Sequence, residues 1–301
     1  MTLVSVVLPT RNRPRFLACA VRSVRAQCEI DLELIVVDDG SCPPAAIPED
    51  PRIRLIRHDV QRGVSAARNS GVAVARGEWV AFCDDDDVWA PGKLAAQLAA
   101  AGASGAGWAY VGNVTVDDNL HVLGGGPAIS PREVVQDLGR YNTVPGSASS
   151  VLANRAVLAS AGGFDIRLRH AEDWDMWLRV ARHGLPARVN RPLVGLRQHA
   201  RNASREVEPL LHEVSFVGRR YGLRVDLPRH LRWAAWLRLE DGQRIAAINC
   251  YLQAAAHGDV RSLARAVVAG VDRGVVQRRR RVDRAWANQA EPWLECLRAA
   301  C

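Results

Sequence analysis

The sequence lacks the patterns that mark disulfide-rich secreted proteins, zinc sites and membrane spans. Its seven cysteines form no Cys-x-x-Cys pair and follow no regular spacing, which indicates neither a disulfide framework nor a zinc site. No segment approaches the roughly 18 consecutive apolar residues that a membrane span needs. The strand-like run Val4–Leu8 is reached without the long apolar stretch of a signal peptide. We therefore expect a cytoplasmic protein, with peripheral attachment to the inner face of the membrane as a second option.

Length and charge leave several domain organisations and several classes of partner open. The 301 residues are 48% hydrophobic, which is enough for a sizeable core in one large domain or in a domain with an appendage. The formal net charge of +8 and the pI near 9.6 favour an acidic partner, such as a nucleotide phosphate, an anionic lipid surface or nucleic acid. Charge alone does not choose among these partners.

A run of four carboxylates is the most informative part of the chain. Asp84–Asp87 follows directly on Trp79–Cys83, an apolar run of strand length. Adjacent like charges repel, so a fold that holds them at a strand end needs positive charge there. Carboxylate oxygens with room for water and phosphate oxygens suit Mg²⁺ or Mn²⁺ better than Zn²⁺. The alternative is a solvated acidic turn, the usual fate of a charge run.

Apolar strands alternate with helical patterns through the first third of the chain. The patterns predict strands at residues 4–8, 32–37, 53–56 and 79–83 and helices at residues 14–26, 64–75 and 91–101. Such alternation is typical of a parallel α/β sheet, which binds ligands at the carboxyl ends of its strands. Both acidic clusters, Asp38–Asp39 and Asp84–Asp87, fall at such ends.

The remainder of the chain changes character near residue 203. Before that point the patterns predict a hairpin, a short helix, an acidic helix start and a strand pair, at residues 108–126, 155–161, 170–179 and 187–196. From about Ser204 onward, Arg/Ala/Leu helices are separated by short glycine-containing breaks. This composition is typical of a helical module that is added to a core domain.

Arg278–Arg281 is a basic run within this module. Its plain interpretation is a solvated helix face. An anionic membrane surface is another option, because each clustered Arg adds about 1 kcal/mol of attraction near acidic lipid. No nucleic-acid partner is expected, since neither interleaved aromatic residues nor a nucleic-acid motif accompanies the run.

Five ordered motifs resemble those of the family 2 glycosyltransferases of the GT-A fold. The segments that carry the resemblance are Val4–Asn12, Leu34–Ser41, Gly63–Gly71, Ala81–Trp89, and Gly163–Asp165 with Glu172–Trp174. The resemblance covers roughly residues 3–200. It implies an α/β fold of the nucleotide-diphospho-sugar transferase type, with a Rossmann-like, mostly parallel sheet over residues 1–203 and a C-terminal α-helical extension over residues 204–301.

The resemblance implies a nucleoside diphosphate sugar as the donor, bound together with Mg²⁺ or Mn²⁺. Asp39 is similar to the residue that accepts a hydrogen bond from uracil N3–H, a contact that thymine would satisfy as well. Arg68 resembles a partner of the base or diphosphate, with a structural role on the helix surface as the alternative. The implied donor-binding residues are Pro9, Thr10, Arg11, Asn12, Asp39, Arg68, Asp84 and Asp85, and the implied metal ligands are Asp84, Asp86 and His199. His199 resembles a late His that contacts the metal or the diphosphate in some members, with a structural role as the alternative.

The acceptor side needs a general base, because a hydroxyl group has a pKa far above neutral. Asp173 matches the catalytic-base motif of the family, and Glu172 is an alternative base or an acceptor-binding carboxylate. The resemblance implies inversion in a single displacement, which requires no enzyme nucleophile, and no Gly-x-Ser-x-Gly elbow is present. The other interpretation of Asp173 is a helix N-cap, where Asp is also favoured.

The acceptor stays open as a glycan, a lipid-linked molecule or a small natural product, because Gly124–Ser149 and the helical extension match no motif. A homo-oligomer formed through the extension is a further option. A sugar-phosphate nucleotidyltransferase is disfavoured, since that class carries a Gly-rich loop where Pro9–Pro14 has no glycine. A non-catalytic nucleotide-binding protein is disfavoured by the intact carboxylates at positions 84, 86 and 173.

Overall fold

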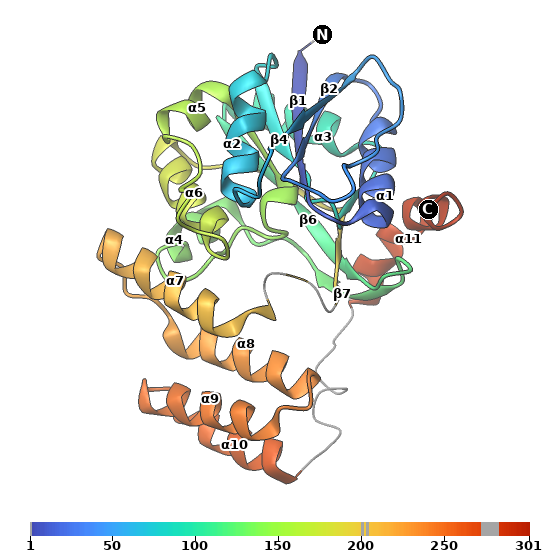
Figure 1. The fold of residues 1–301 in the computed structure, drawn as a ribbon. Coiled ribbons are helices and arrows are strands. Elements are labelled where there is room, and N and C mark those ends of the chain that lie inside the picture. The colour runs from blue at the N-terminus through green and yellow to red at the C-terminus, as the bar shows by residue number, and fades with distance from the viewer. Residues whose placement is uncertain (1, 200–201, 203–204, 272–282) are drawn as a thin grey trace. The chain divides into compact units, whose positions relative to one another are not determined.

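The computed structural model describes residues 2–199, 202, 205–271 and 283–301 (Figure 1). The chain forms two compact units. The first contains the described residues of Met1–Leu138, Thr143–His199 and Val282–Cys301, and the second those of Gly139–Asn142 and Ala200–Arg281.

The first unit begins with a parallel half-sheet. The strands β1 (Leu3–Thr10), β2 (Asp31–Asp38), β3 (Ile53–Arg57) and β4 (Trp79–Phe82) lie in the order β3-β2-β1-β4, and all pair in parallel. The register pairs Thr10 with Asp38 at the carboxyl ends of β1 and β2. Both acidic clusters therefore lie at one edge of the sheet, as the alternation of strands and helices predicts.

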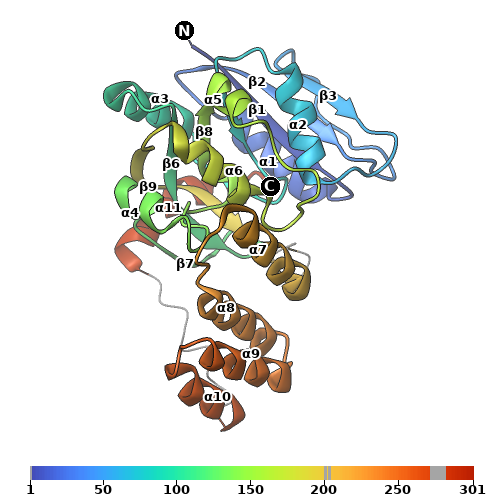
Figure 2. The ribbon, with the colours of Figure 1, turned by 90° about the vertical axis from the view of Figure 1, so that its left-hand side faces the viewer.

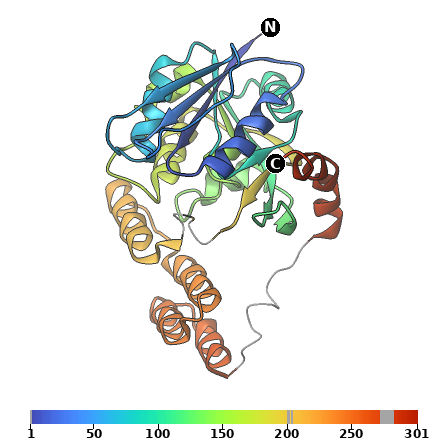
Figure 3. The same ribbon diagram turned by 45° about the vertical axis from the view of Figure 1, so that its right-hand side comes forward.

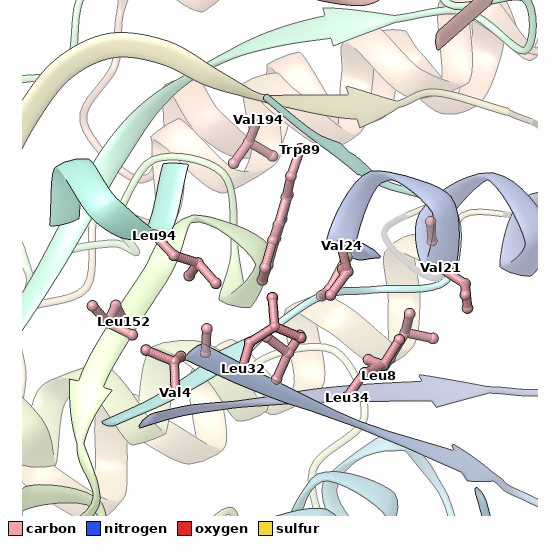
Figure 4. Packing of buried hydrophobic residues seen from close by; sticks show 14 of the residues in the cluster. Val4, Leu8, Val21, Val24, Leu32, Leu34, Trp89, Leu94, Leu152 and Val194 are labelled. Carbon is pink, nitrogen blue, oxygen red and sulfur yellow. The ribbon is translucent and has the colours of Figure 1, made fainter. Parts of the chain in front are cut away.

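Two helices cover opposite faces of β1. Alternate residues of the strand, among them Val4 and Leu8, share a buried cluster with Val21 and Val24 of α1 (Pro14–Arg25), which Figure 4 shows from close by. On the other face, Val7 lies against α2 (Val64–Val74). Because both faces are covered, the strand is almost wholly apolar rather than alternating.

The second half of the sheet is mixed. The strand β8 (Val151–Asn154) is antiparallel to β4 and to β6 (Trp108–Val116). In turn, β6 pairs in parallel with β9 (Ala187–Arg197) and antiparallel with β7 (Val122–Gly126), and β5 (Val88–Trp89) is antiparallel to β9.

The predicted strand pair around residues 187–196 is wrong, because these residues form the single strand β9. The register with β6 shifts between the pairs Val111↔Val189 and Gly112↔Pro192. Such an irregularity accommodates Pro192, which has no N–H to donate to the ladder.

Four helices complete the main body of this unit: α3 (Lys93–Ser104), α4 (Pro131–Asp137), α5 (Arg155–Ser160) and α6 (Glu172–Val180). A capping box starts α4, in which Ser130 and Glu133 satisfy each other's backbone N–H groups. The first turn of α6 is acidic, with Glu172, Asp173 and Asp175 near the positive end of the helix dipole.

The last helix, α11 (Arg284–Arg298), belongs to the first unit (Figure 3). Trp286, Ala290 and Leu294 recur on one helix face and pack with Val88 and Val114 of the sheet. Residues 284–298 therefore depart from the sequence-based division, which placed everything after residue 203 in one extension. The reason is the apolar face of α11, which is buried against β-strands.

A disulfide joins Cys19 of α1 to Cys301. The cysteine spacing indicated no disulfide, and that prediction is wrong for this pair. The two residues are 282 positions apart in the sequence and meet only because α11 returns to the first unit, which local spacing does not reveal.

The second unit consists of α7 (Val207–Tyr221), α8 (Leu227–Glu240), α9 (Arg244–Ala256) and α10 (Arg261–Val271), which Figure 2 shows in sequence. Gly222, Gly242 and Gly258 follow the first three helices with positive φ angles, as is common at helix ends. None of the described helices is long and apolar enough to cross a membrane. The basic run Arg278–Arg281 lies outside the described residues.

Gly71 tests how closely α2 packs against β1. A Cβ atom at this position would lie 2.4 Å from Val7 Cγ1, and Val7 is fully buried. We expect Gly71→Ala to lower the free energy of unfolding by about 1–3 kcal/mol through overpacking, although Ala normally favours a helix over Gly.

Gly102→Ala in α3 is the matched control, because a Cβ atom there meets nothing within 4 Å. It should raise the free energy of unfolding by up to about 1 kcal/mol. Denaturant titration measures both variants, and equal gains in stability would contradict the close packing.

Candidate active site

The carboxyl ends of β1, β2 and β4 meet at the acidic run. Thr10 Oγ1 donates a hydrogen bond to Asp85 Oδ2 at 2.8 Å, and Asp39 N donates to the Thr10 carbonyl at 2.9 Å. The side chains of Asp85, Asp86 and Asp87 are nearly buried. The alternative of a solvated acidic turn is therefore wrong.

Three arginines supply the positive charge that the run requires. Arg13 Nη1 lies 3.0 Å from Asp85 Oδ1 and 2.8 Å from Asp86 Oδ2. Arg197 donates from Nε to the Asp86 carbonyl at 2.8 Å and from its backbone N–H to Asp87 Oδ1 at 3.1 Å. The third arginine is Arg68. Sequence reasoning missed Arg13 and Arg197, although Arg13 immediately follows the donor-loop motif.

The cations do not fully offset the carboxylates. Burial, together with the neighbouring Asp86, raises the pKa of Asp85 to about 7, against the opposing effects of Arg13 and Thr10. Burial also raises the pKa of Asp87 well above its usual value, with Asp86 and Asp84 adding to the shift. Both shifts favour the neutral form of the carboxyl groups, and a further cation beside the cluster would oppose them.

Arg68 joins the acidic run to the acceptor-side motif. Its side chain is almost wholly buried, so Arg68 does not lie on the helix surface. Nη2 lies 2.6 Å from Asp84 Oδ1 and Nη1 lies 2.8 Å from Glu172 Oε1. The guanidinium also lies over the Phe164 ring, 5.2 Å from its centroid.

Asp173 lies beside this bridge in the first turn of α6. Its Oδ2 accepts a hydrogen bond from the Ser147 hydroxyl at 3.0 Å, and its Oδ1 accepts one from Trp174 N at 2.7 Å. The helix N-cap is Ala171, which provides no side-chain cap, so the N-cap interpretation of Asp173 is wrong. Ser147 was missed because its loop matches no motif.

Burial perturbs both carboxylates of this pair. It raises the pKa of Asp173, and the positive charge of Arg68 opposes the shift. It also raises the pKa of Glu172, where Arg68 again opposes and the negative charge of Asp173 adds to it. Glu172 has the direct contact with Arg68, whereas Asp173 accepts hydrogen bonds from Ser147 and from Trp174 N.

Asp39, which follows the end of β2, forms hydrogen bonds with the loop before α2. It accepts hydrogen bonds from Arg62 N, Gly63 N and His58 Nδ1, each at 2.8 Å. His58 Nε2 in turn lies 2.9 Å from Ser70 Oγ. An ionised carboxylate offers about four acceptor positions, so Asp39 retains capacity for one further donor. Sequence reasoning missed His58. Its position directly after β3, at the same edge of the sheet as Asp39, could have indicated that it lies near the site.

The donor loop after β1 is held by its neighbours. Arg11 N lies 3.4 Å from Asp85 Oδ2. Asn12 has a φ angle of 54°, and its Oδ1 accepts a hydrogen bond from Cys42 N at 2.8 Å. Pro9, the last buried apolar position of β1, is paired with Val37. The loop therefore has a defined path beside the acidic run.

His199 reaches the same cluster from the end of β9. Its Nε2 lies 3.0 Å from Asp86 Oδ2, and its ring stacks on Phe16 with centroids 4.8 Å apart. The structure thus brings all three implied metal ligands to one edge of the sheet. In the described part of the chain, no group of three or more His, Cys, Asp or Glu side chains is placed to hold a metal ion.

Arg68→Lys tests the bridge between the two motifs. Lys keeps the charge but lacks the planar fork that reaches two carboxylates at once, so one buried carboxylate loses its partner. We expect the free energy of unfolding to fall by about 2 kcal/mol or more at neutral pH. Arg62→Lys is the matched control, because Arg62 is exposed and should change stability by less than about 0.5 kcal/mol. Equal unfolding midpoints for the two variants would contradict the bridge.

Comparison with known sequences identifies the family. The family model described as glycosyl transferase family 2 matches residues 5–158. WfgD of Escherichia coli, a UDP-Glc:alpha-D-GlcNAc-diphosphoundecaprenol beta-1,3-glucosyltransferase, is 27% identical over 192 residues, which cover 62% of this chain and 73% of WfgD. The succinoglycan biosynthesis protein ExoO of Rhizobium meliloti is 41% identical over 125 residues, which are 40% of this chain and 34% of ExoO.

Solved structures share the fold. The 1-349 fragment of S. aureus TarS, in complex with UDP-GlcNAc, matches with a TM-score of 0.58 and 14% identity over 92% of this chain and 91% of the fragment. This likeness confirms the predicted GT-A-type α/β architecture with C-terminal helices. The family match covers about half of the chain, including β1 to β5 and the acidic run that they position, and the chain belongs to glycosyl transferase family 2.

Proposed function

We propose that the chain transfers a sugar from a uridine or thymidine diphosphate sugar to an acceptor hydroxyl, with inversion at the anomeric carbon. The observation that carries this proposal is the Arg68 bridge. One buried guanidinium contacts Asp84 of the strand-end cluster and Glu172, which precedes Asp173. A donor held at the cluster and a base on α6 would therefore act within one site.

The donor side suits a nucleotide. Asp39 has capacity for one further hydrogen-bond donor, which the N3–H of uracil or thymine would provide. Uridine is supported by two relatives, because the TarS fragment is in complex with UDP-GlcNAc and WfgD is named for UDP-Glc. Thr10 and Arg11 both contact Asp85 at the neighbouring strand ends, where the ribose and diphosphate would follow the base.

Mg²⁺ or Mn²⁺ would suit the carboxylate oxygens of the acidic run, because both ions prefer oxygen ligands. Asp84 and Asp86 would hold the ion, together with His199, whose Nε2 lies 3.0 Å from Asp86 Oδ2. Mg²⁺ commonly takes one or two carboxylates and completes its shell with water and substrate phosphates. A bound ion supplies charge that offsets the negative charge on the departing diphosphate.

Asp173 is the proposed general base. The acceptor oxygen forms a bond to C1 while the bond from C1 to the diphosphate oxygen breaks, and the diphosphate leaves with the electron pair. The acceptor proton passes to a carboxylate oxygen of Asp173. Attack on the face opposite the leaving group inverts C1. Burial raises the pKa of Asp173 and so makes it a stronger base, while Ser147 fixes its orientation.

A lipid-linked glycan is the proposed acceptor class. WfgD is named for a sugar carried on diphosphoundecaprenol and covers 62% of this chain. An acceptor sugar hydroxyl near Asp173 would meet the chemistry above, whichever lipid carries the sugar.

Binding of a nucleoside diphosphate tests the donor and metal assignments. We expect calorimetry to show UDP or dTDP binding in the presence of Mg²⁺ or Mn²⁺, with at least about a tenfold loss of affinity when a chelator is added. Asp86→Asn should cause a similar loss with the metal present, because a neutral amide is a weaker ligand than a carboxylate. Equal affinity with and without chelator would remove the metal from the proposal.

Asp173→Asn tests the base. The amide keeps the size but cannot take a proton at neutral pH, so transfer should fall by about 10²–10⁴-fold while UDP affinity changes little. In the wild type, transfer should decline as the pH falls through the raised pKa of Asp173, because protonation removes the base.

Asp31→Asn is the matched control for this variant, because Asp31 is exposed at the start of β2, the opposite end of that strand from the site. It should retain wild-type turnover. Near-wild-type turnover in Asp173→Asn, with an unchanged melting temperature, would exclude Asp173 as the base.

A further inference from the structure

Large apolar side chains gather on one stretch of the second unit. Of the twelve exposed large hydrophobic residues in the part of the chain that the structure describes, seven lie between residues 245 and 271. Single exposed hydrophobic residues are normal, whereas a group of them marks an interaction surface. We call the exposed side of α10 and the residue preceding its first turn the valine face, which comprises Val260, Leu263, Val267, Val268 and Val271.

The helix α10 has its small residues inside and its large apolar residues outside. Its buried positions are Ser262, Ala266 and Ala269, whereas Val267 is 66% exposed and Val271 is 78% exposed. The valine face recurs every three or four residues, so it forms one continuous stripe along the helix. The packing of α10 within the unit does not account for this stripe.

The segment that carries the valine face has a small excess of positive charge. Residues 242–271 contain a single acidic residue, Asp259, and three arginines. Asp259 Oδ2 accepts hydrogen bonds from Arg232 at 2.7 Å and from Arg265 at 3.1 Å, so its charge is compensated. Arg261 is exposed on α10 itself. An apolar stripe with basic residues beside it is typical of helices that lie in a membrane interface.

We propose that the valine face docks on an anionic lipid bilayer, with its apolar side chains at the boundary between headgroups and acyl chains. The arginines of the segment complement the negative surface of such a bilayer. A second copy of the chain is disfavoured as the occupant, because it would bring the same basic surface against itself. This docking goes beyond the proposed transfer, since it requires neither donor nor catalysis.

Sedimentation of the full chain with lipid vesicles tests the proposal. The chain should bind phosphatidylcholine vesicles that contain phosphatidylglycerol, more weakly at high salt, and should bind pure phosphatidylcholine vesicles less. Val267→Ser/Val271→Ser removes apolar area without changing charge, and it should lower the partition coefficient by at least about tenfold. The matched control is Val60→Ser/Ile166→Ser, which replaces exposed residues of the first unit and should bind as the wild type does.

Several results would overturn the proposal. The wild type could fail to bind either vesicle, or the Val267/Val271 serine pair could bind as tightly as the wild type. A wild-type dimer in light scattering that this pair dissociates would assign the face to a second copy. If the pair does not fold, Val271→Ser alone gives the test, with about a threefold loss expected. Transfer to a soluble acceptor should be unchanged in the serine pair, which separates a failure of docking from a failure of the proposed chemistry.

Discussion

The crowding of four carboxylates at the end of β4 is the constraint on which the first unit depends. Charges this close repel, and burial removes the water that would otherwise screen them. The chain meets this cost with Arg13 from the loop after β1, Arg68 from α2 and Arg197 from the end of β9. Because the three cations come from distant parts of the sequence, the acidic run is tolerated only when all three elements are in place. The site and the fold are therefore stabilised by the same contacts.

The compensation is incomplete, and this has a chemical consequence. Burial raises the pKa of Asp85 to about 7, with Asp86 adding to the shift and Arg13 opposing it. A raised pKa means that the neutral carboxyl is favoured, and a further cation beside the cluster would favour the ionised form instead. The divalent ion proposed above would add positive charge beside Arg68, which contacts Asp84 and Glu172. The electrostatics thus connect the stability of the free protein with the proposed ion dependence of donor binding.

Local pattern predicts the sheet and the strand ends, but not the partners of the side chains there. The bounds of β6 and the positions of Asp39 and Asp84–Asp87 follow from apolar runs that end at acidic residues. The contacts of Arg13 and Ser147 depend on the paths of irregular loops, which no periodicity specifies. The return of α11 and its disulfide depend on contacts between the two ends of the sequence. Contacts between residues so far apart in the sequence depend on the tertiary fold, and the local spacing of residue types does not predict them.

The first unit buries charged residues and the second exposes large apolar residues, and both are unusual in a folded protein. The first places charged groups such as Arg68 and Asp87 out of contact with water, and the second leaves Val267 and Val271 in it. Each departure costs free energy in the isolated chain, because buried charge loses hydration and exposed apolar surface orders water. Neither cost is relieved by further packing within its own unit. The two proposals assign a ligand to each place, a cation with a nucleotide phosphate to the first and an anionic bilayer to the second.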